Sequence, residues 1–256
     1  MYYSMLGYGF IITIFVFMLA TIYLGRFIAL SSSVSIEDRK TTKVAENAIY
    51  GLTALLVALT FAGASVKFDS RRNLIISEVN AVETTYLRLG LLDDDKSEAL
   101  RHEIRGYLKS RISIYDKLPN LSAVYDEVER SLGLQKKLWG SVANACKSTD
   151  KILACQMIIP LINNMFDIAN TRVESTQIHP PEIIFILLFI LAFISALFAG
   201  YNTASKTFLG SMHIVAYAAI TAITIYIIID MEYPRFGFVQ VHSFDVVLDD
   251  LLKRIS

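Results

Sequence analysis

Residues 48–89 read AIYGLTALLVALTFAGASVKFDSRRNLIISEVNAVETTYLRL, an uncharged half followed by a charged half. Up to Val66 the stretch carries no charged residue and is suited to span a membrane. After Lys67 its apolar residues recur with helical spacing, at Ile75, Val79, Val82, Tyr86 and Leu89. No Pro or Gly lies between Ala64 and Leu89. The stretch therefore predicts one continuous helix, about 60 Å long at about 1.5 Å per residue, that leaves the membrane and enters water.

Three further segments are as free of charge as the first half of that helix. The chain has 256 residues, of which 54% are hydrophobic and 19% charged, whereas soluble domains average about 25% charged. A membrane helix needs about 20 apolar residues, and the uncharged segments are 1–25, 47–66, 183–205 and 207–229. We expect an all-α integral membrane protein with four transmembrane helices. The first is expected to be retained, because no basic residue precedes Arg26 and the apolar run exceeds a signal-peptide core.

The composition and the missing motifs exclude several classes of protein. The apolar excess excludes an ordinary soluble enzyme and a disordered chain. The 24 Lys and Arg residues balance 24 Asp and Glu residues, which argues against a nucleic-acid binder. We find no phosphate-binding loop, no His-Glu-x-x-His zinc motif and no Gly-x-Ser-x-Gly nucleophile motif. We therefore expect no enzymatic activity, no cofactor and no metal site.

The distribution of charge divides the chain into four parts. Most charged residues lie in residues 67–181, which we expect to form a helical extramembrane domain between the second and third spans. Residues 1–66 hold the first two spans and their connecting loop. Residues 182–229 hold the third and fourth spans, and residues 230–256 form a helical C-terminal tail.

The extramembrane domain is predicted to contain helices and no sheet, because no segment alternates with the period of a strand. Asp95, with Glu98 three residues on, resembles a helix cap. The helix that follows carries one inward stripe, formed by Leu100, Ile104, Tyr107, Leu108, Arg111 and Tyr115. Further helices are expected over residues 122–145 and 150–177, the latter interrupted at Pro160.

The second span sorts into three stripes on a helix. A mildly polar stripe, which we predict to line a pore, consists of Thr53, Val57, Thr60, Ala64 and Lys67. The alternative is that the Thr hydroxyls bond to their own helix and Lys67 reaches to the membrane surface. A bulky stripe consists of Leu52, Leu55, Leu59 and Val66. Small residues let helices approach closely, so we predict helix packing along the stripe of Gly51, Ala54, Ala58, Ala62 and Ser65.

The third span repeats the small-residue pattern at Ala192, Ala196 and Gly200, which again predicts a helix contact. Charged residues gather at the ends of the second and fourth spans. We predict that they form either a buried charge network or the mouth of a pore, and the set is Asp69, Arg71, Arg72, Glu78, Asp230, Glu232 and Arg235.

Two features leave the orientation of the protein open. Equal numbers of basic residues flank the spans on the two sides, so the positive-inside rule does not choose between them. Cys146 and Cys155 could form a disulfide outside the cytoplasm or remain thiols inside it.

Short motifs along residues 48–255 resemble an uncharacterised membrane family described as bestrophin-like. The motifs are Phe68-Asp69-x-Arg71-Arg72, Glu78-x-Asn80-Ala81, Tyr86-x-Arg88, Asn163-x-Met165-x-Asp167, Thr171-Arg172, Ser195-Ala196-Leu197, Gly200-Tyr201 and Asp230-x-Glu232-Tyr233-Pro234-Arg235-x-Gly237. Order and spacing both match.

A more distant likeness connects this layout to the bestrophins. Bestrophins are pentameric anion channels whose second spans line the pore, with their termini and helical domain in the cytoplasm. The resemblance implies the same placement here, in an inner or plasma membrane. The chain departs from bestrophins because Phe61 is the one aromatic residue of the second span after Tyr50, and because the tail has no acidic calcium clasp.

These observations predict a homo-oligomeric ion channel that is anion-selective, with its pore lined by the second span. Its expected partners are membrane lipid, small inorganic anions and further copies of the chain, five in all by analogy. Lys67, Arg71 and Arg72, repeated around an axis, would attract anions. A membrane-anchored scaffold that does not conduct ions is the alternative.

Overall fold

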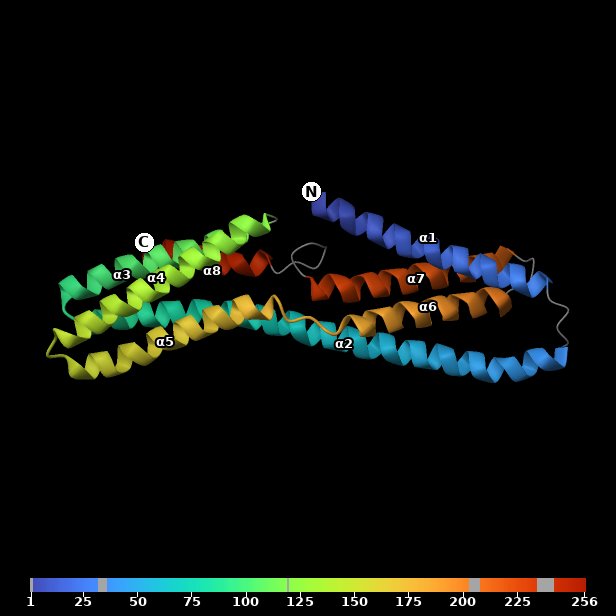
Figure 1. The fold of residues 1–256 in the computed structure, drawn as a ribbon, viewed down its shortest axis with the longest axis horizontal. Helices are drawn as coiled ribbons and strands as arrows, with labels where there is room; N and C mark the ends of the chain where they lie inside the picture. The colour runs from blue at the N-terminus through green and yellow to red at the C-terminus, as the bar shows by residue number, and fades with distance from the viewer. Residues whose placement is uncertain (1, 32–35, 119, 203–207, 234–241) are drawn as a thin grey trace. The chain divides into compact units, whose positions relative to one another are not determined.

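The computed structural model describes residues 2–31, 36–118, 120–202, 208–233 and 242–256, and every regular element in these ranges is a helix (Figure 1). The all-α class is thereby confirmed. In chain order the elements are α1 Tyr2–Ser31, α2 Ile36–Arg88, the 3₁₀ turn η1 Leu89–Leu91, α3 Asp94–Asp116, α4 Leu121–Lys147, α5 Ile152–Ser175, α6 Glu182–Asn202, α7 Phe208–Glu232 and α8 His242–Ile255.

Helix α2 is continuous over 53 residues, which confirms the single helix predicted for residues 48–89. It ends at Arg88 and passes into η1, where the Leu89 side chain is fully buried. From Ala64 to Arg88 the helix contains no Pro or Gly, which favours its continuation beyond the apolar half.

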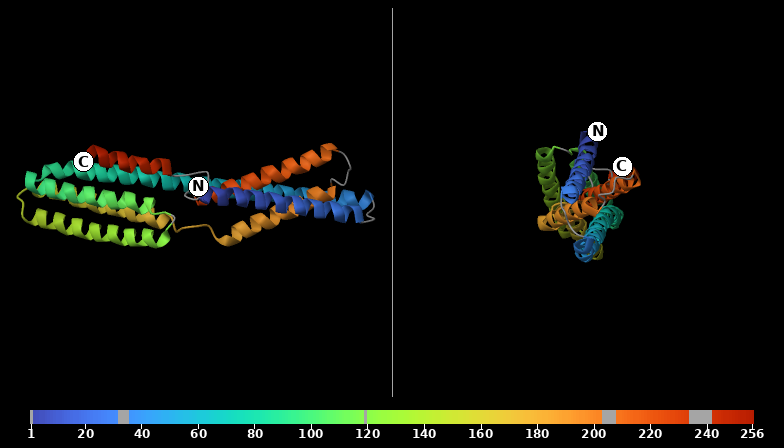
Figure 2. Two further views of the ribbon diagram at one scale, coloured as in Figure 1. Left: turned by 90° about the horizontal axis from the view of Figure 1, so that it is seen from above. Right: turned by 90° about the vertical axis from the view of Figure 1, so that its right-hand side faces the viewer.

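The chain forms two compact units, and α2 contributes to both. The first unit holds residues 1–69 and 179–240, with α1, α6, α7 and the first part of α2. Helix α1 packs along α6 and contacts α7 (Figures 1 and 2). The apolar core of this first unit includes Met18, Ile22, Leu188, Ala192 and Ala218.

Glycines set the crossing of α1 and α6. A Cβ atom on Gly200 would lie 1.9 Å from the carbonyl oxygen of Ile22, and one on Gly25 would lie 2.0 Å from that of Leu197. Neither distance allows a side chain, so the two backbones touch directly. Ala192 and Ala196 are fully buried on the same helix, and this is the close contact expected of the third-span stripe.

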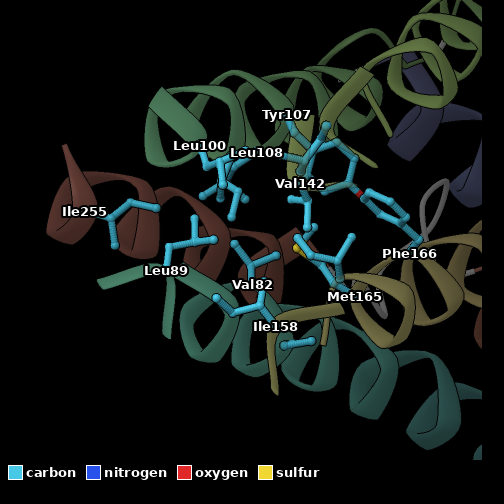
Figure 3. Packing of buried hydrophobic residues seen from close by; sticks show 14 of the residues in the cluster. Val82, Leu89, Leu100, Tyr107, Leu108, Val142, Ile158, Met165, Phe166 and Ile255 are labelled. Atoms are coloured by element: carbon cyan, nitrogen blue, oxygen red, sulfur yellow. The ribbon is translucent and has the colours of Figure 1, made fainter. Parts of the chain in front are cut away.

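The second unit holds residues 70–178 and 241–256. Side chains of α2, α3, α4, α5 and α8 meet in one apolar core, in which Val82, Leu108, Val142 and Ile158 are buried (Figure 3). Helix α8 adds Leu248, Leu251 and Ile255 to this core. The helix over residues 242–255 thus belongs to the second unit.

Two local expectations about the second unit are wrong. The N-cap position of α3 is Asp93 and not Asp95, and the Asp93 side chain makes no capping bond. Helix α5 runs through Pro160 without a break. A proline inside a helix costs about 3 kcal/mol, and the buried neighbours Ile158 and Ile162 supply tertiary packing that offsets this cost.

Five helices of the described ranges are long and apolar enough to cross a membrane, one more than the sequence predicted. The additional helix is α5, whose mean hydropathy of 1.5 is half the value of 3.0 in α6. Its buried face packs into the core of the second unit, where Ile158, Ile162 and Met165 lie.

Candidate functional site

The mildly polar stripe of α2 faces the interior of the first unit. The Thr53 hydroxyl lies 2.8 Å from the Ser195 hydroxyl of α6 and donates to the Ile49 carbonyl at 2.8 Å. Ala64 is buried in the apolar core. This geometry argues against pore lining at Thr53 and Ala64, because a threonine that satisfies its hydroxyl internally packs as a small apolar side chain.

The remaining members of this stripe are half-buried. Thr60 donates to the carbonyl oxygens of Leu56 and Val57, at 2.8 and 3.0 Å. Val57 packs against the core of the first unit. The alternative in which the Thr hydroxyls bond to their own helix describes both threonines.

The other two stripes of α2 are open. Gly51, Ala54, Ala58 and Ala62 are exposed, and so are the bulky residues, with Leu59 at 62%. Only 11% of the apolar window of α2 is buried inside the chain. These four small residues are therefore not covered by another helix within the described part of this chain. An apolar helix face of this extent is available to a second copy of the chain or to lipid.

Lys67, at the end of the membrane half of α2, forms an ion pair with Glu232 of α7. Its Nζ atom lies 3.2 Å from Oε1 of Glu232, and the Glu232 side chain is almost completely buried. His179 also contacts Oε1, through Nδ1 at 3.1 Å, and its ring stacks on Tyr233 at 4.6 Å between centroids. The sequence analysis placed Lys67 on the pore-lining stripe and Glu232 in the charge set, and it missed His179, which directly precedes Pro180.

Other members of the predicted charge set are placed differently. Asp230 is buried and accepts a hydrogen bond from the Tyr226 hydroxyl at 3.4 Å. Asp69 is exposed and Arg72 is half-buried. Arg235 lies outside the described residues.

Arg71 binds the end of α5. Its guanidinium donates from Nε to the Ser175 carbonyl at 3.3 Å and from Nη2 to the Ile178 carbonyl at 3.5 Å. The last carbonyls of a helix have no partner within the helix and attract positive charge. Arg71 thus fixes the segment that leaves α5, and its side chain is buried in this position.

Glu78 belongs to a buried charge cluster inside the second unit. Its carboxylate accepts from Nε of Arg111 at 2.5 Å and from Nη1 of Arg172 at 2.7 Å. The exposed fractions of the three side chains are 0%, 2% and 3%. The Arg172 guanidinium also lies 4.1 Å from the centre of the Tyr115 ring. Of the two predicted roles for Glu78, this geometry supports the charge network.

The protonation of this cluster follows from its surroundings. Burial by itself raises the pKa of the Glu78 carboxyl, but Arg111 and Arg172 outweigh burial and hold the pKa below its ordinary value. Arg111 was placed on an apolar stripe by the sequence. A charged residue on such a stripe indicates that it has a buried partner of opposite charge. Which residue is that partner can be read only from the three-dimensional structure.

Residues 11–243 match the sequence family described as the Bestrophin-like domain. No curated protein matches the chain by sequence.

Solved structures share the fold at low sequence identity. A crystal structure of a point-substituted bacterial bestrophin homologue from Klebsiella pneumoniae superposes with a TM-score of 0.71 and 10% identity, covering 94% of this chain and 99% of that chain. A second substituted form from Klebsiella pneumoniae gives 0.69 at 11% identity, covering 94% and 98%. A structure described as a membrane protein gives 0.71 at 11% identity, covering 93% and 96%. With a family match over nearly its whole length, this chain belongs to the Bestrophin-like family.

Proposed function

We propose that this protein is a homo-oligomeric ion channel of an inner or plasma membrane, with no enzymatic activity. Four spans, α1, the first half of α2, α6 and α7, cross the membrane. The second unit, with the chain termini, lies on the cytoplasmic side. The number of subunits is five, by analogy with the bestrophins.

One observation carries the proposal. Although α2 is long and apolar, only 11% of its most apolar segment is buried inside the chain. Its open faces require either lipid or further copies of the chain, and the Bestrophin-like family match favours further copies arranged around an axis.

The two open stripes of α2 take different roles in this arrangement. The small stripe of Ala54, Ala58 and Ala62 allows a neighbouring helix to approach closely and packs against the next subunit. The bulky stripe, which contains Leu55 and Leu59, then faces the axis. An apolar constriction of this kind passes ions only when it is wide enough to stay wet.

We place the anion preference at Arg72, which is half-buried at the end of this span, because Arg71 is buried against the Ser175 and Ile178 carbonyls. Lys67 contributes less, because Glu232 lies 3.2 Å from its ammonium and offsets the charge. Repeated around an axis, one such arginine per chain raises the local concentration of anions.

Ion flux from liposomes tests conduction. We expect chloride flux from a defined oligomer of the purified protein. A stable oligomer that passes neither chloride nor potassium between pH 5 and 8, with closure by a gate excluded by single-channel recording, would favour the non-conducting scaffold instead.

Cysteine substitution tests which stripe lines the pore, in a Cys146→Ser/Cys155→Ser background. Leu59→Cys is expected to lose most of its flux on reaction with a charged methanethiosulfonate, because the added group then lies in the pore. Ala58→Cys is the matched control on the packing stripe and should be insensitive. The reverse pattern would assign the pore to the small stripe.

Selectivity is tested by neutralising single cations. We expect Arg72→Gln to lower the chloride-to-potassium permeability ratio roughly threefold. Lys67→Met should leave that ratio unchanged while lowering the melting temperature, because it removes one charged partner of a buried carboxylate. An unchanged ratio in Arg72→Gln would remove this residue from the selectivity mechanism.

A further inference from the structure

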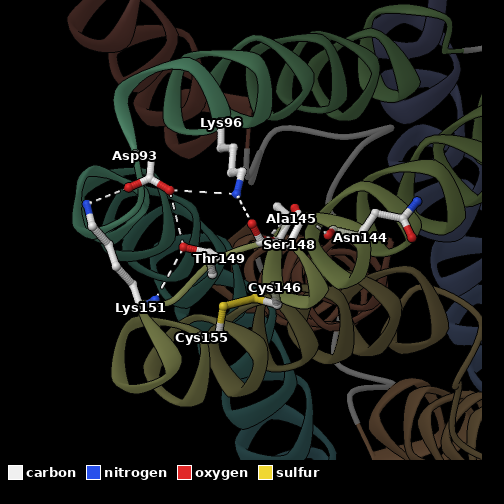
Figure 4. The surroundings of a disulfide bond; sticks show 9 residues. All are labelled: Asp93, Lys96, Asn144, Ala145, Cys146, Ser148, Thr149, Lys151 and Cys155. Carbon is white, nitrogen blue, oxygen red and sulfur yellow. Dashed lines mark hydrogen bonds and ion pairs between the residues drawn. A yellow bond between two sulfur atoms is a disulfide. The ribbon is translucent and has the colours of Figure 1, made fainter.

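A disulfide bond between Cys146 and Cys155 closes the connection between α4 and α5 (Figure 4). Of the two states that the sequence left open, the structure therefore contains the disulfide. Cys146 lies in the last turn of α4 and Cys155 in the first turn of α5, nine residues further on. These are the two cysteines of the whole sequence.

Polar contacts around the bond tie the connection to the start of α3. Lys96 donates from Nζ to the Ser148 carbonyl at 2.6 Å. Asp93 accepts from Thr149 at 3.2 Å and lies 3.0 Å from Nζ of Lys151. The Asp93 and Lys151 side chains are 43% and 47% exposed, and exposed ion pairs contribute little stability. The covalent bond is thus the strongest constraint on this corner of the unit.

The two sulfurs have different surroundings. Cys155 is 6% exposed and belongs to the apolar core beside Ala154 and Ile158. Cys146 is half-buried at the end of α4. A small thiol in solution therefore reaches Cys146 more easily than Cys155. After reduction Cys155 remains suited to its position, because a protonated cysteine packs as a small apolar residue.

We propose that Cys146 and Cys155 form a reversible redox-modification site that exchanges with low-molecular-weight thiols and disulfides, with Cys146 as the sulfur attacked. The state of the bond determines how firmly the connection between α4 and α5 is held. This inference goes beyond ion conduction and does not require it. It rests on the proposed cytoplasmic position of the second unit in one respect, because disulfides in that compartment are usually transient and redox-active.

The exchange balances in two steps. A small thiolate attacks Sγ of Cys146 and forms a mixed disulfide, and the Cys146–Cys155 bond breaks to release Cys155 as a thiolate that takes up a proton. A second small thiolate attacks the small-molecule sulfur of the mixed disulfide. It releases the small disulfide and frees Cys146, which is protonated in turn. Two small thiols are oxidised, the cystine is reduced by two electrons, and oxidised small disulfide drives the reverse reaction.

The test uses the full-length protein in detergent, equilibrated with mixtures of reduced and oxidised glutathione. Acid quenching, alkylation and mass spectrometry give the fraction of cystine. We expect full interconversion while the protein stays folded, and alkylation of Cys146 at least roughly tenfold faster than that of Cys155 in the reduced state.

Stability and local opening provide the second measurement. Reduction should lower the melting temperature by roughly 5–10 °C, because the closed loop constrains the unfolded chain. Amide exchange should rise around Ser148–Lys151 and stay unchanged around Glu78. The Cys146→Ser/Cys155→Ser variant should have the melting temperature of the reduced protein, and glutathione should not change it.

Three results would overturn the proposal. The bond could resist glutathione until urea unfolds the protein, which would make it a purely structural disulfide. Reduction could leave both the melting temperature and amide exchange unchanged. Oxidised glutathione could fail to restore the bond. Because none of these readouts uses ion flux, they remain distinct from failure of the channel proposal.

Discussion

At the scale of single residues, Glu78 joins two arginines from two other helices with one carboxylate. Taking these charges out of water is costly, and their mutual attraction offsets that cost only when the partners are in place. Arg111 also donates to the Ala169 carbonyl at 3.3 Å. The cluster therefore fixes α2, α3 and α5 in one arrangement inside the second unit.

Glu78→Gln is expected to destabilise the protein by about 3–5 kcal/mol, because Arg111 and Arg172 stay buried without the carboxylate. Chemical denaturation followed by helix content measures this loss. Glu83→Gln is the matched control, since Glu83 pairs with Arg254 at 3.3 Å on the surface, and should cost less than about 1 kcal/mol. Equal losses in the two variants would contradict the buried cluster.

Acid should weaken the same cluster. The pKa of Glu78 is lowered from its ordinary 4.5, so its contribution is fully present above pH 4.5 and is lost as the pH falls through the lowered pKa. The difference in melting temperature between the wild type and Glu78→Gln should therefore be constant near neutral pH and shrink in acid. A constant difference down to pH 3 would show that the carboxylate charge does not matter.

At the scale of elements, the α1–α6 crossing depends on two glycines that have no room for a side chain. A Cβ on Gly200 would lie 1.9 Å from a backbone oxygen of Ile22. Backbone cannot move aside as a flexible side chain can, so the helices would have to separate. The sequence predicted only the Gly200 side of this contact, on the small-residue stripe of the third span.

Gly200→Leu is expected to lower the yield of folded protein and its melting temperature by at least roughly 10 °C, through loss of the α1–α6 contact. Gly133→Ala in α4 is the control, because a Cβ there meets nothing within 4 Å. It should stabilise the protein by up to about 1 kcal/mol. A Gly200→Leu protein as stable as the wild type would show that the two helices are not in direct contact.

At the scale of the whole molecule, two compact units share α2. The first unit leaves the small and bulky faces of α2 open, and the second unit encloses its share of α2 in a core with four other helices. The mass of the protein in detergent should therefore be a multiple of the 28.7 kDa chain. A monomeric mass would contradict the assembly.

Ala58→Trp should lower the fraction of oligomer, because the indole would obstruct the close helix contact that we propose along the small stripe.

The sequence by itself determined the helical class, the continuity of α2 and the family, because these depend on local properties. Charge-free runs, helical spacing and ordered motifs can all be read along one segment at a time. It also identified Lys67 and Glu232 as candidate site residues, since both stand at the ends of apolar spans.

Only the tertiary structure decided which face of α2 turns inward, namely the face of Thr53 and Ala64. Any of the three stripes could face inward as far as the local sequence shows. Which one does so depends on complementary residues far along the chain, such as Ser195. The same holds for Glu78 with Arg172, which are 94 residues apart, and for the bond between Cys146 and Cys155. The type of a side chain indicates what kind of partner it needs, whereas the three-dimensional packing determines which residue becomes that partner.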